Sequence, residues 1–351
     1  MINPHRRGVV RVGLLVVLSG LLGELAVTAQ DAAGVTVPAG PDLSHLVWRN
    51  VGPGGIGGRI SDFAVVAVDP DTVYVGTAQS GVWKTVNGGI TWEPVFDAQP
   101  RQAIGGIAVA ATNPNLVWVG TGESSGRNLV STSWGDGIYK SEDGGKSWRN
   151  MGLTKSLHIG RIRIDPRDED VVFVSVIGPL VHDIEDANEA RGLYRTTDGG
   201  DTWRKVLSAG PYAGFVDLDF DPRDPDVLYA TAWHRQRVDW SWIPTGDDGG
   251  VWRSADGGDT WDKLTNGLPA GDMGRIGVSV CRSQPDTVYL NIEGPEGGVY
   301  RSDDRGASWE QTNADVRGSQ YYAQVRCDPE DAERVYVLST AFNVSTDGGR
   351  T

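Results

Sequence analysis

A short motif with the pattern S/T-x-D/N-x-G-x-S/T-W recurs along the chain and restricts its fold more than any other feature. Complete copies end at Trp92, Trp148, Trp203, Trp261 and Trp309, and a sixth, Ser345–Thr351, lacks the tryptophan. The copies lie roughly 50 residues apart, a period typical of one repeated structural unit. Each copy predicts a tight turn, because Asp and Ser side chains accept hydrogen bonds from backbone amides two residues on and glycine allows positive φ.

The residues around each copy predict four short strands. In the third repeat the runs are Ile162–Pro166, Val172–Val174, Gly192–Arg195 and Trp203–Val206, and the motif lies between the last two. Short β-branched or aromatic runs bounded by Gly, Pro and Asp are typical of strands, and four antiparallel strands per repeat form a propeller blade. We therefore expect an all-β fold, a β-propeller of four-stranded antiparallel blades with five complete blades and a partial sixth. The expected blades are residues 45–97, 98–152, 153–208, 209–265, 266–312 and 313–351, the last incomplete.

The two ends of the repeat array leave two alternatives open. His45–Val51 resembles the last strand of a blade, and the sixth repeat stops before its own last strand. Either the N-terminal strand completes the last blade of a six-bladed ring, or further blades follow the interrupted motif.

The N-terminus has the pattern of a secretory signal peptide. The segment begins with three positive charges, Arg6, Arg7 and Arg11. A mostly apolar run follows as far as Leu22, and Val27–Ala29 is a small-residue cleavage site. We expect residues 1–29 to be removed and the protein to be secreted or periplasmic. The apolar run is short for a membrane span, so we expect no membrane insertion after cleavage. Residues 30–44 are expected to be a flexible leader, and residues 45–351 the propeller.

The formal net charge of −14 disfavours nucleic acid as a partner, because phosphates would repel an acidic protein. Two cysteines, Cys281 and Cys327, are too few for a disulfide framework. They fall near the ends of corresponding strands but one residue out of register, and strand side chains alternate between faces. Two free thiols are therefore expected, with a bridge in an oxidising compartment as the alternative. No cofactor is expected, and no His/Asp spacing indicates a metal site.

Around the repeated motif, the chain resembles the BNR/Asp-box propeller superfamily. It is more similar to secreted bacterial sortilin-like or BNR-repeat glycosyl hydrolase-like proteins, through Trp48–Ile60, Asn188–Trp203 and Leu264–Gly277. The resemblance covers residues 45–351 and implies the fold; it leaves activity open, because the superfamily includes enzymes and non-enzymes. Xyloglucanase-type members carry a catalytic Asp after the second strand of their first blade. The matching stretch, Gly76–Gly81, holds no carboxylate, which counts against that mechanism.

The strand order places the motif turns and the Asp-Pro turns at one end of the blades. The loops between second and third strands then lie at the other end, where functional loops on a rigid scaffold are expected. Three of these loops are long: Gly120–Gly137, Gly178–Arg191 and Trp233–Asp248. Acidic residues in the second of them are expected to form a solvated surface.

Aromatic and charged residues in these loops are the candidate site. Exposed aromatic rings stack on sugars, so Trp134, Trp240 and Trp242 are expected to form a sugar platform or, alternatively, to cap the loops. The other candidate ligand-binding residues in the loops are Arg127, His234 and Arg237, and the candidate catalytic carboxylates are Glu123, Asp136, Asp239 and Asp247.

Three first strands begin Gly-Arg-Ile, at Arg59, Arg161 and Arg275. These arginines could ring the channel mouth and bind a carboxylate in a bidentate manner. Because alternate blades should place them far apart, a structural role is favoured.

Two functional hypotheses follow. The first is a propeller that binds a glycan or an extracellular protein or peptide at the loop face. The alternative is a glycoside hydrolase, which needs two of the candidate carboxylates roughly 5–9.5 Å apart.

Overall fold

The computed structural model describes residues 59–125, 132–180, 188–238, 240–316, 321–339 and 341–351. All of the described residues belong to one compact unit. The expected signal peptide, the leader and the strand His45–Val51 lie outside the described residues.

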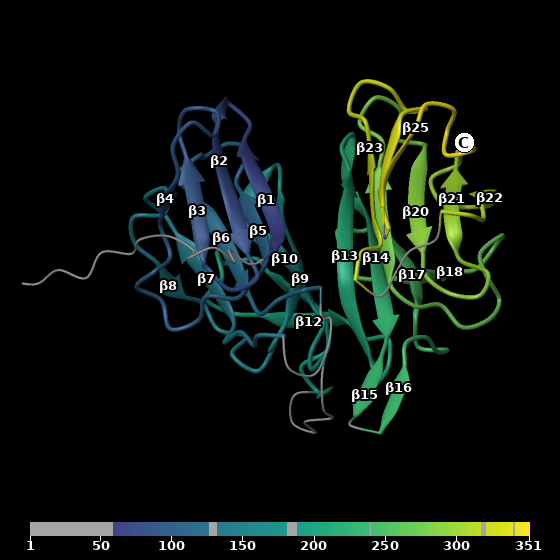
Figure 1. Cartoon of the computed structure of the whole chain (residues 1–351), viewed down its shortest axis with the longest axis horizontal. Coiled ribbons are helices and arrows are strands. Elements are labelled where there is room, and N and C mark those ends of the chain that lie inside the picture. Colours follow the sequence, from purple (N-terminus) through teal and green to yellow (C-terminus); the bar gives the residue numbers. More distant parts are fainter. Residues whose placement is uncertain (1–58, 126–131, 181–187, 239, 317–320, 340) are drawn as a thin grey trace, which may run out of the picture. The chain divides into compact units, whose positions relative to one another are not determined.

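Six antiparallel sheets follow one another along the described chain (Figure 1). Blade 1 consists of β1 (Ile60–Val66), β2 (Asp69–Thr77), β3 (Val82–Thr85) and β4 (Glu93–Pro94). Blade 2 consists of β5 (Ile104–Val109), β6 (Val117–Thr121), β7 (Ile138–Ser141) and β8 (Arg149–Asn150). Blade 3 consists of β9 (Ile159–Asp165), β10 (Asp168–Val176), β11 (Gly192–Thr196) and β12 (Arg204–Leu207). Blade 4 consists of β13 (Ala213–Asp221), β14 (Asp224–His234), β17 (Gly250–Ser254) and β18 (Asp262–Leu264). Blade 5 consists of β19 (Ile276–Val280), β20 (Val288–Ile292), β21 (Gly298–Ser302) and β22 (Glu310–Asn313). Blade 6 consists of β23 (Gln324–Cys327), β24 (Val335–Leu338) and β25 (Phe342–Ser345).

The first strand of each sheet is the innermost one. Strands β1, β5, β9, β13, β19 and β23 contact one another in sequence order. The fold is thus an all-β, six-bladed propeller of antiparallel sheets, as the repeat predicts. Five sheets have four strands, and β23–β25 form a sheet of three in the described part of the chain. A separate hairpin of β15 (Gln236–Val238) and β16 (Ser241–Ile243) is inserted between β14 and β17.

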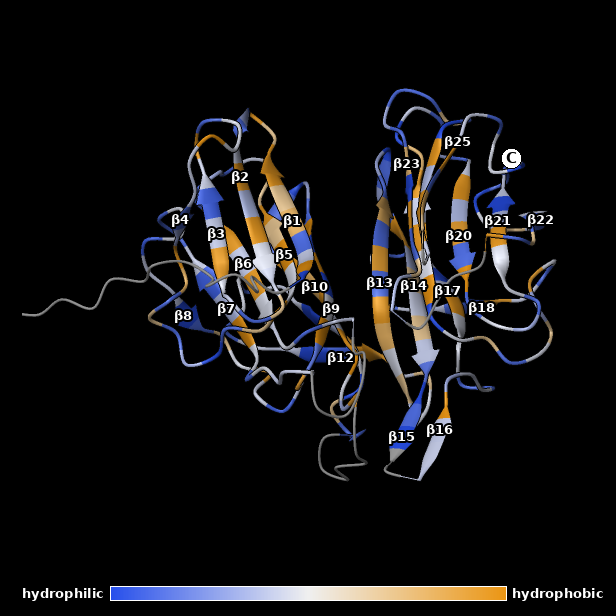
Figure 2. Cartoon of the chain, viewed as in Figure 1, coloured by the Kyte–Doolittle hydropathy of each residue, from blue (hydrophilic) through white to orange (hydrophobic). Residues whose placement is uncertain are grey.

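The hydrophobic core lies between neighbouring blades. Hydrophobic residues are concentrated in the strands, as the orange segments of Figure 2 show, and hydrophilic residues in many of the connecting turns. The motif tryptophans extend this packing outward: the indole Nε1 of Trp148 donates to the carbonyl of Val95 at 2.7 Å, and that of Trp203 to Met151 at 2.8 Å. Each of these two tryptophans thereby fastens its blade to the preceding one.

The repeated motif forms the same hydrogen-bonded turn in blade after blade. In blade 2, the amide of Gly145 donates to Ser141 Oγ and the amide of Ser147 to Asp143 Oδ1, at 2.8 and 2.9 Å. The Asp therefore accepts from the amide four residues on, rather than two as expected. Hydrogen bonds to Asp143, first from the hydroxyl and then from the amide of Ser147, lower its pKa to about 2.

The motif turns lie beside the turns between first and second strands. The amide of Gly144 donates to the carbonyl of Asn115, and that of Gly199 to Asp170, within the same blades. Both kinds of turn therefore occupy one end of the blades. The loops between second and third strands occupy the other end, called the loop face below.

Cys281 and Cys327 form a disulfide bond, so the expectation of free thiols is wrong. Cys281 follows Val280, the last residue of β19, and its side chain is no longer fixed to one face by the pleat of the strand. Cys327 ends β23, and the two Cα atoms lie 5.2 Å apart. The bond joins blade 5 to blade 6.

Candidate functional site

The loops of the loop face are anchored to the starts of the inner strands. The amide of Ala78 donates to the carbonyl of Arg59, that of Ile177 to His158 and that of Glu293 to Arg275, at 2.8 to 2.9 Å. Because one strand pair in each blade carries both partners, the rigid sheets hold the loop bases in place over the inner strands.

An open pocket of about 420 Å³ lies on the loop face between blades 1 and 2. Its wall includes Gln79, Arg101 and Gln102 beside Trp134, whose surface is 42% exposed. We call it the Trp134 pocket. An exposed indole flanked by an amide and a guanidinium offers one surface for stacking and donors for hydroxyl groups.

The three candidate tryptophans have different surroundings. Trp242 is half-buried on β16, where the guanidinium carbons of Arg235 and Arg237 lie 4.7 and 4.9 Å from its ring centre. Trp240, at the turn of the hairpin, is 86% exposed. Trp242 therefore caps its own loop, which was the alternative expectation, whereas Trp134 and Trp240 present their rings to solvent.

The candidate carboxylates differ in accessibility. Glu123 is fully buried, and its Oε1 accepts from both Nε and Nη2 of Arg59. Asp136 is half-buried and accepts the hydroxyl of Tyr139 at 3.0 Å, a contact that adds to burial in raising the pKa of Tyr139. Asp247 is exposed. Asp239 and Arg127 lie outside the described residues.

The candidate histidine, His234, lies at the base of the inserted hairpin. His234 Nδ1 lies 3.5 Å from Asp248 Oδ2, and its Nε2 lies 3.2 Å from the amide of Gln236. These contacts place His234 at the junction of β14 and β15.

The three arginines of the Gly-Arg-Ile starts each have a partner within the propeller. Arg59 pairs with Glu123, Arg161 with Asp62 and Asp217, and Arg275 Nη1 donates to the carbonyl of Ser124 at 2.7 Å. Arg161 and Arg275 line the same small central cavity of about 10 Å³. The expectation that alternate blades separate these two arginines is wrong, because the inner strands converge at the centre.

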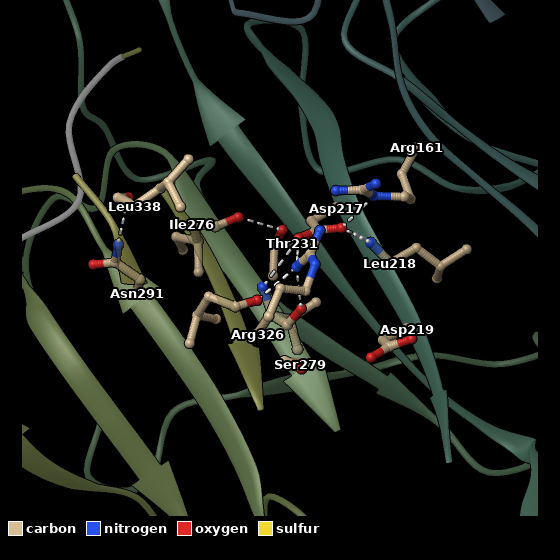
Figure 3. A network of polar contacts seen from close by, with 12 residues as sticks. Arg161, Asp217, Leu218, Asp219, Thr231, Ile276, Ser279, Asn291, Arg326 and Leu338 are labelled. Carbon is tan, nitrogen blue, oxygen red and sulfur yellow. Dashed lines mark hydrogen bonds and ion pairs between the residues drawn. The ribbon is translucent and has the colours of Figure 1, made fainter. Parts of the chain in front are cut away.

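Asp217 is the centre of a buried polar network that links four blades (Figure 3). Its Oδ1 accepts from Arg161 Nε at 2.8 Å, and its Oδ2 lies 3.4 Å from Arg326 Nη1. Burial would raise the pKa of Asp217, but the charges of Arg161, Arg326 and Arg163 outweigh it and hold the pKa well below its usual range. Sequence reasoning missed this network, because Asp62, Asp217 and Arg326 lie in three different repeats.

Among the residues that the structure describes, no cluster of His, Cys, Asp and Glu side chains could hold a metal ion. No helix in the described ranges is long and apolar enough to cross a membrane.

The chain is similar in sequence to a xyloglucanase and in fold to GH74 enzymes. No family model matches. A curated xyloglucanase from Paenibacillus sp. is 26% identical over 282 residues, which are 71% of this chain and 25% of that protein. The GH74 enzyme of Niastella koreensis aligns with a TM-score of 0.62 at 18% identity, over 82% of this chain and 45% of that one. The GH74 xyloglucanase of Xanthomonas campestris aligns with a TM-score of 0.61 at 16% identity, over 84% and 46%.

The structural alignments establish a shared propeller fold. The chain spans a quarter of the length of the curated relative and less than half of either solved structure.

Proposed function

We propose that this chain is a propeller of a glycoside hydrolase-like protein that engages a polysaccharide at its loop face. The observation that supports this most is the sequence similarity to a xyloglucanase over 71% of the chain. The Trp134 pocket supplies the matching chemistry, because its exposed indole can stack on a sugar ring while Gln79 and Arg101 reach hydroxyl groups.

The proposed substrate is a plant-type β-glucan such as xyloglucan. The candidate carboxylates for hydrolysis are Asp136, two residues after Trp134 in the sequence, and Asp247, with Asp239 as a third. Glu123 is proposed to position its loop through Arg59, since it is fully buried. A retaining or inverting mechanism would need one carboxylate pair roughly 5–9.5 Å apart when substrate is bound.

Binding without hydrolysis is the second candidate. It is favoured by the state of the carboxylates: Glu123 is buried in an ion pair, and Asp136 already accepts from Tyr139. Gly76–Gly81 holds no carboxylate either. In this case a glycan, or an extracellular protein or peptide, would contact the Trp134 pocket and the exposed Trp240.

A hydrolysis screen separates the two candidates. Xyloglucan and other polysaccharides are incubated with the protein, and released oligosaccharides are measured. Hydrolysis that falls roughly 100-fold or more in Asp136→Asn or Asp247→Asn, and is unchanged in Asp201→Asn on the motif end, supports the enzyme. Retention on a polysaccharide without products supports binding alone. If the protein neither hydrolyses a polysaccharide nor is retained on one, both hydrolysis and glycan binding are overturned.

We also propose that the protein is exported. The disulfide between Cys281 and Cys327 supports this, because such bonds persist in oxidising compartments. N-terminal sequencing of the protein recovered from the extracellular or periplasmic fraction should begin at Gln30; an intact N-terminus would contradict export by cleavage.

A further inference from the structure

Arg235 is a buried cation at the loop face of blade 4. It follows β14, its side chain is 1% exposed, and its backbone amide donates to the carbonyl of Tyr212. Its guanidinium carbon lies 4.7 Å from the ring centres of both Trp233 and Trp242. Two indoles thus lie within cation–π distance of one charged group.

The nitrogen atoms of this guanidinium have no hydrogen-bond partner within the described residues. This holds for Nε, Nη1 and Nη2 of Arg235 alike. Buried polar groups in native proteins nearly always have partners, and a buried charge without one is costly. Such an exception indicates a partner other than these residues, such as a water molecule or a bound anion.

The neighbouring charges increase this cost. Burial lowers the pKa of Arg235 to about 9, and repulsion from Arg237, Arg275 and Arg191 adds to the shift, opposed by Glu293. Arg275 approaches the same aromatic group, with its guanidinium carbon 5.4 Å from the ring centre of Trp233. A negative group placed here would relieve the repulsion among the arginines.

The shape of the guanidinium also selects the partner. Its N–H groups lie in one plane, so it donates hydrogen bonds along its edge. A carboxylate offers two oxygens in one plane and so matches that edge in a bidentate manner.

A nearby acceptor favours a ligand that also carries a hydroxyl group. His158 is buried, and its Nδ1 lies 2.9 Å from the carbonyl of Glu123, which places the ring hydrogen there and leaves Nε2 as an acceptor. His158 Nε2 has no partner among the described residues. Burial lowers the pKa of His158 to about 3, and the charge of Arg235 contributes to the shift, so the ring is neutral.

We propose that Arg235, beside Trp233 and Trp242, binds the carboxylate of an acidic sugar, a uronate unit of a glycan. The site differs from the Trp134 pocket; its sugar character rests on the proposed function, whereas its anion preference does not. Because Arg235 is buried, the proposal requires that the hairpin β15–β16, which forms its own two-stranded sheet and carries Trp242, moves aside to admit a ligand.

The test is a calorimetric titration of the protein with glucuronate, with thermal unfolding measured in parallel. Glucuronate should bind and raise the melting temperature, because a ligand of the native state stabilises it. Methyl glucoside, which lacks the carboxylate, should do neither. Arg235→Met should weaken glucuronate binding roughly 10- to 100-fold, the value of charge-assisted hydrogen bonds. The control, Lys263→Met, removes another cation that lies over a tryptophan of blade 4 and should bind glucuronate like the wild type.

The unliganded variants distinguish a site from a structural arginine. Replacing an uncompensated buried charge with an apolar side chain is often neutral or stabilising, so Arg235→Met should melt no lower than the wild type without ligand. Arg235→Lys keeps the charge but loses the bidentate edge, and should also bind glucuronate more weakly. A wild-type protein that ignores glucuronate would overturn the proposal. So would equal binding of acetate or of an acidic peptide, since neither is a sugar, or an unliganded Arg235→Met that unfolds.

The two proposals can fail separately. Trp134→Ala should impair xyloglucan binding and leave the glucuronate titration unchanged. Loss of glucuronate binding in Trp134→Ala would contradict a separate site, whereas normal glucuronate binding without any interaction with xyloglucan would contradict the proposed function alone.

Discussion

At the scale of single residues, Asp217 has the strongest influence on how the blades meet. It is 4% exposed and joins Arg161 of blade 3 to Arg326 of blade 6, while Arg161 also reaches Asp62 of blade 1. One carboxylate thus offsets the charges of two buried or partly buried arginines. Removing it leaves Arg161 paired with Asp62 alone and takes from Arg326 the carboxylate that it contacts.

Asp217→Asn should lower the free energy of unfolding by about 3–5 kcal/mol at neutral pH, as for other broken buried ion pairs. The wild type should also lose stability as the pH falls below about 4, because the depressed pKa of Asp217 makes only the unfolded state bind its proton there. Asp217→Asn should show less of this acid dependence. Denaturant unfolding at several pH values measures both effects.

The control for this prediction is Asp219→Asn. Asp219 lies 3.4 Å from Arg163, and the two side chains are 23% and 27% exposed. Solvent screens this pair, so its loss should cost less than half as much. Equal losses for the two variants would contradict the central role of Asp217.

At the scale of elements, the disulfide secures the three-stranded blade. It closes a loop with a sequence separation of 46 residues between the end of β19 and β23. Cys281→Ser should lower the free energy of unfolding by roughly 2–4 kcal/mol, mainly by freeing the unfolded chain. Hydrogen exchange should rise first in β23–β25.

Cys327→Ser is the matched variant for the disulfide. Because either substitution removes the same bond, each single variant and the double variant should lose the same stability. This account would be contradicted if the rate of amide hydrogen exchange in β23–β25 of the wild type were the same with and without reductant.

The elements also show how far sequence carries the account. Blade order, strand order and the location of the motif turns follow from local signals, since turn chemistry and strand periodicity act within a single repeat. The disulfide does not, because register counting stops being valid at Cys281, one residue beyond its strand. The network at Asp217 and the stacking of Arg235 join residues of different blades or of separate loop segments, and no local pattern encodes such contacts. Tryptophans do stand on both sides of Arg235 in the sequence, in the runs Trp233-His234-Arg235 and Trp240–Trp242. This spacing is a sequence signal for the contact between Arg235 and the indoles.

At the scale of the whole molecule, the two ends of the blades have different tasks. The motif turns repeat one hydrogen-bonding pattern and fasten blades together, as at Trp148 and Trp203. The loop face varies from blade to blade and carries the Trp134 pocket and the hairpin with Trp242. We therefore assign structure to the motif end and propose ligand binding for the loop face.

Affinity electrophoresis in gels containing xyloglucan tests this assignment most directly, because two comparably exposed tryptophans lie at opposite ends. Trp134 on the loop face is 42% exposed, and Trp92 in the first motif turn is 39% exposed. We expect xyloglucan to retard the wild type and Trp92→Ala equally, and Trp134→Ala to bind at least about tenfold more weakly, a loss of about 1.4 kcal/mol. Retardation lost in Trp92→Ala but kept in Trp134→Ala would contradict the account.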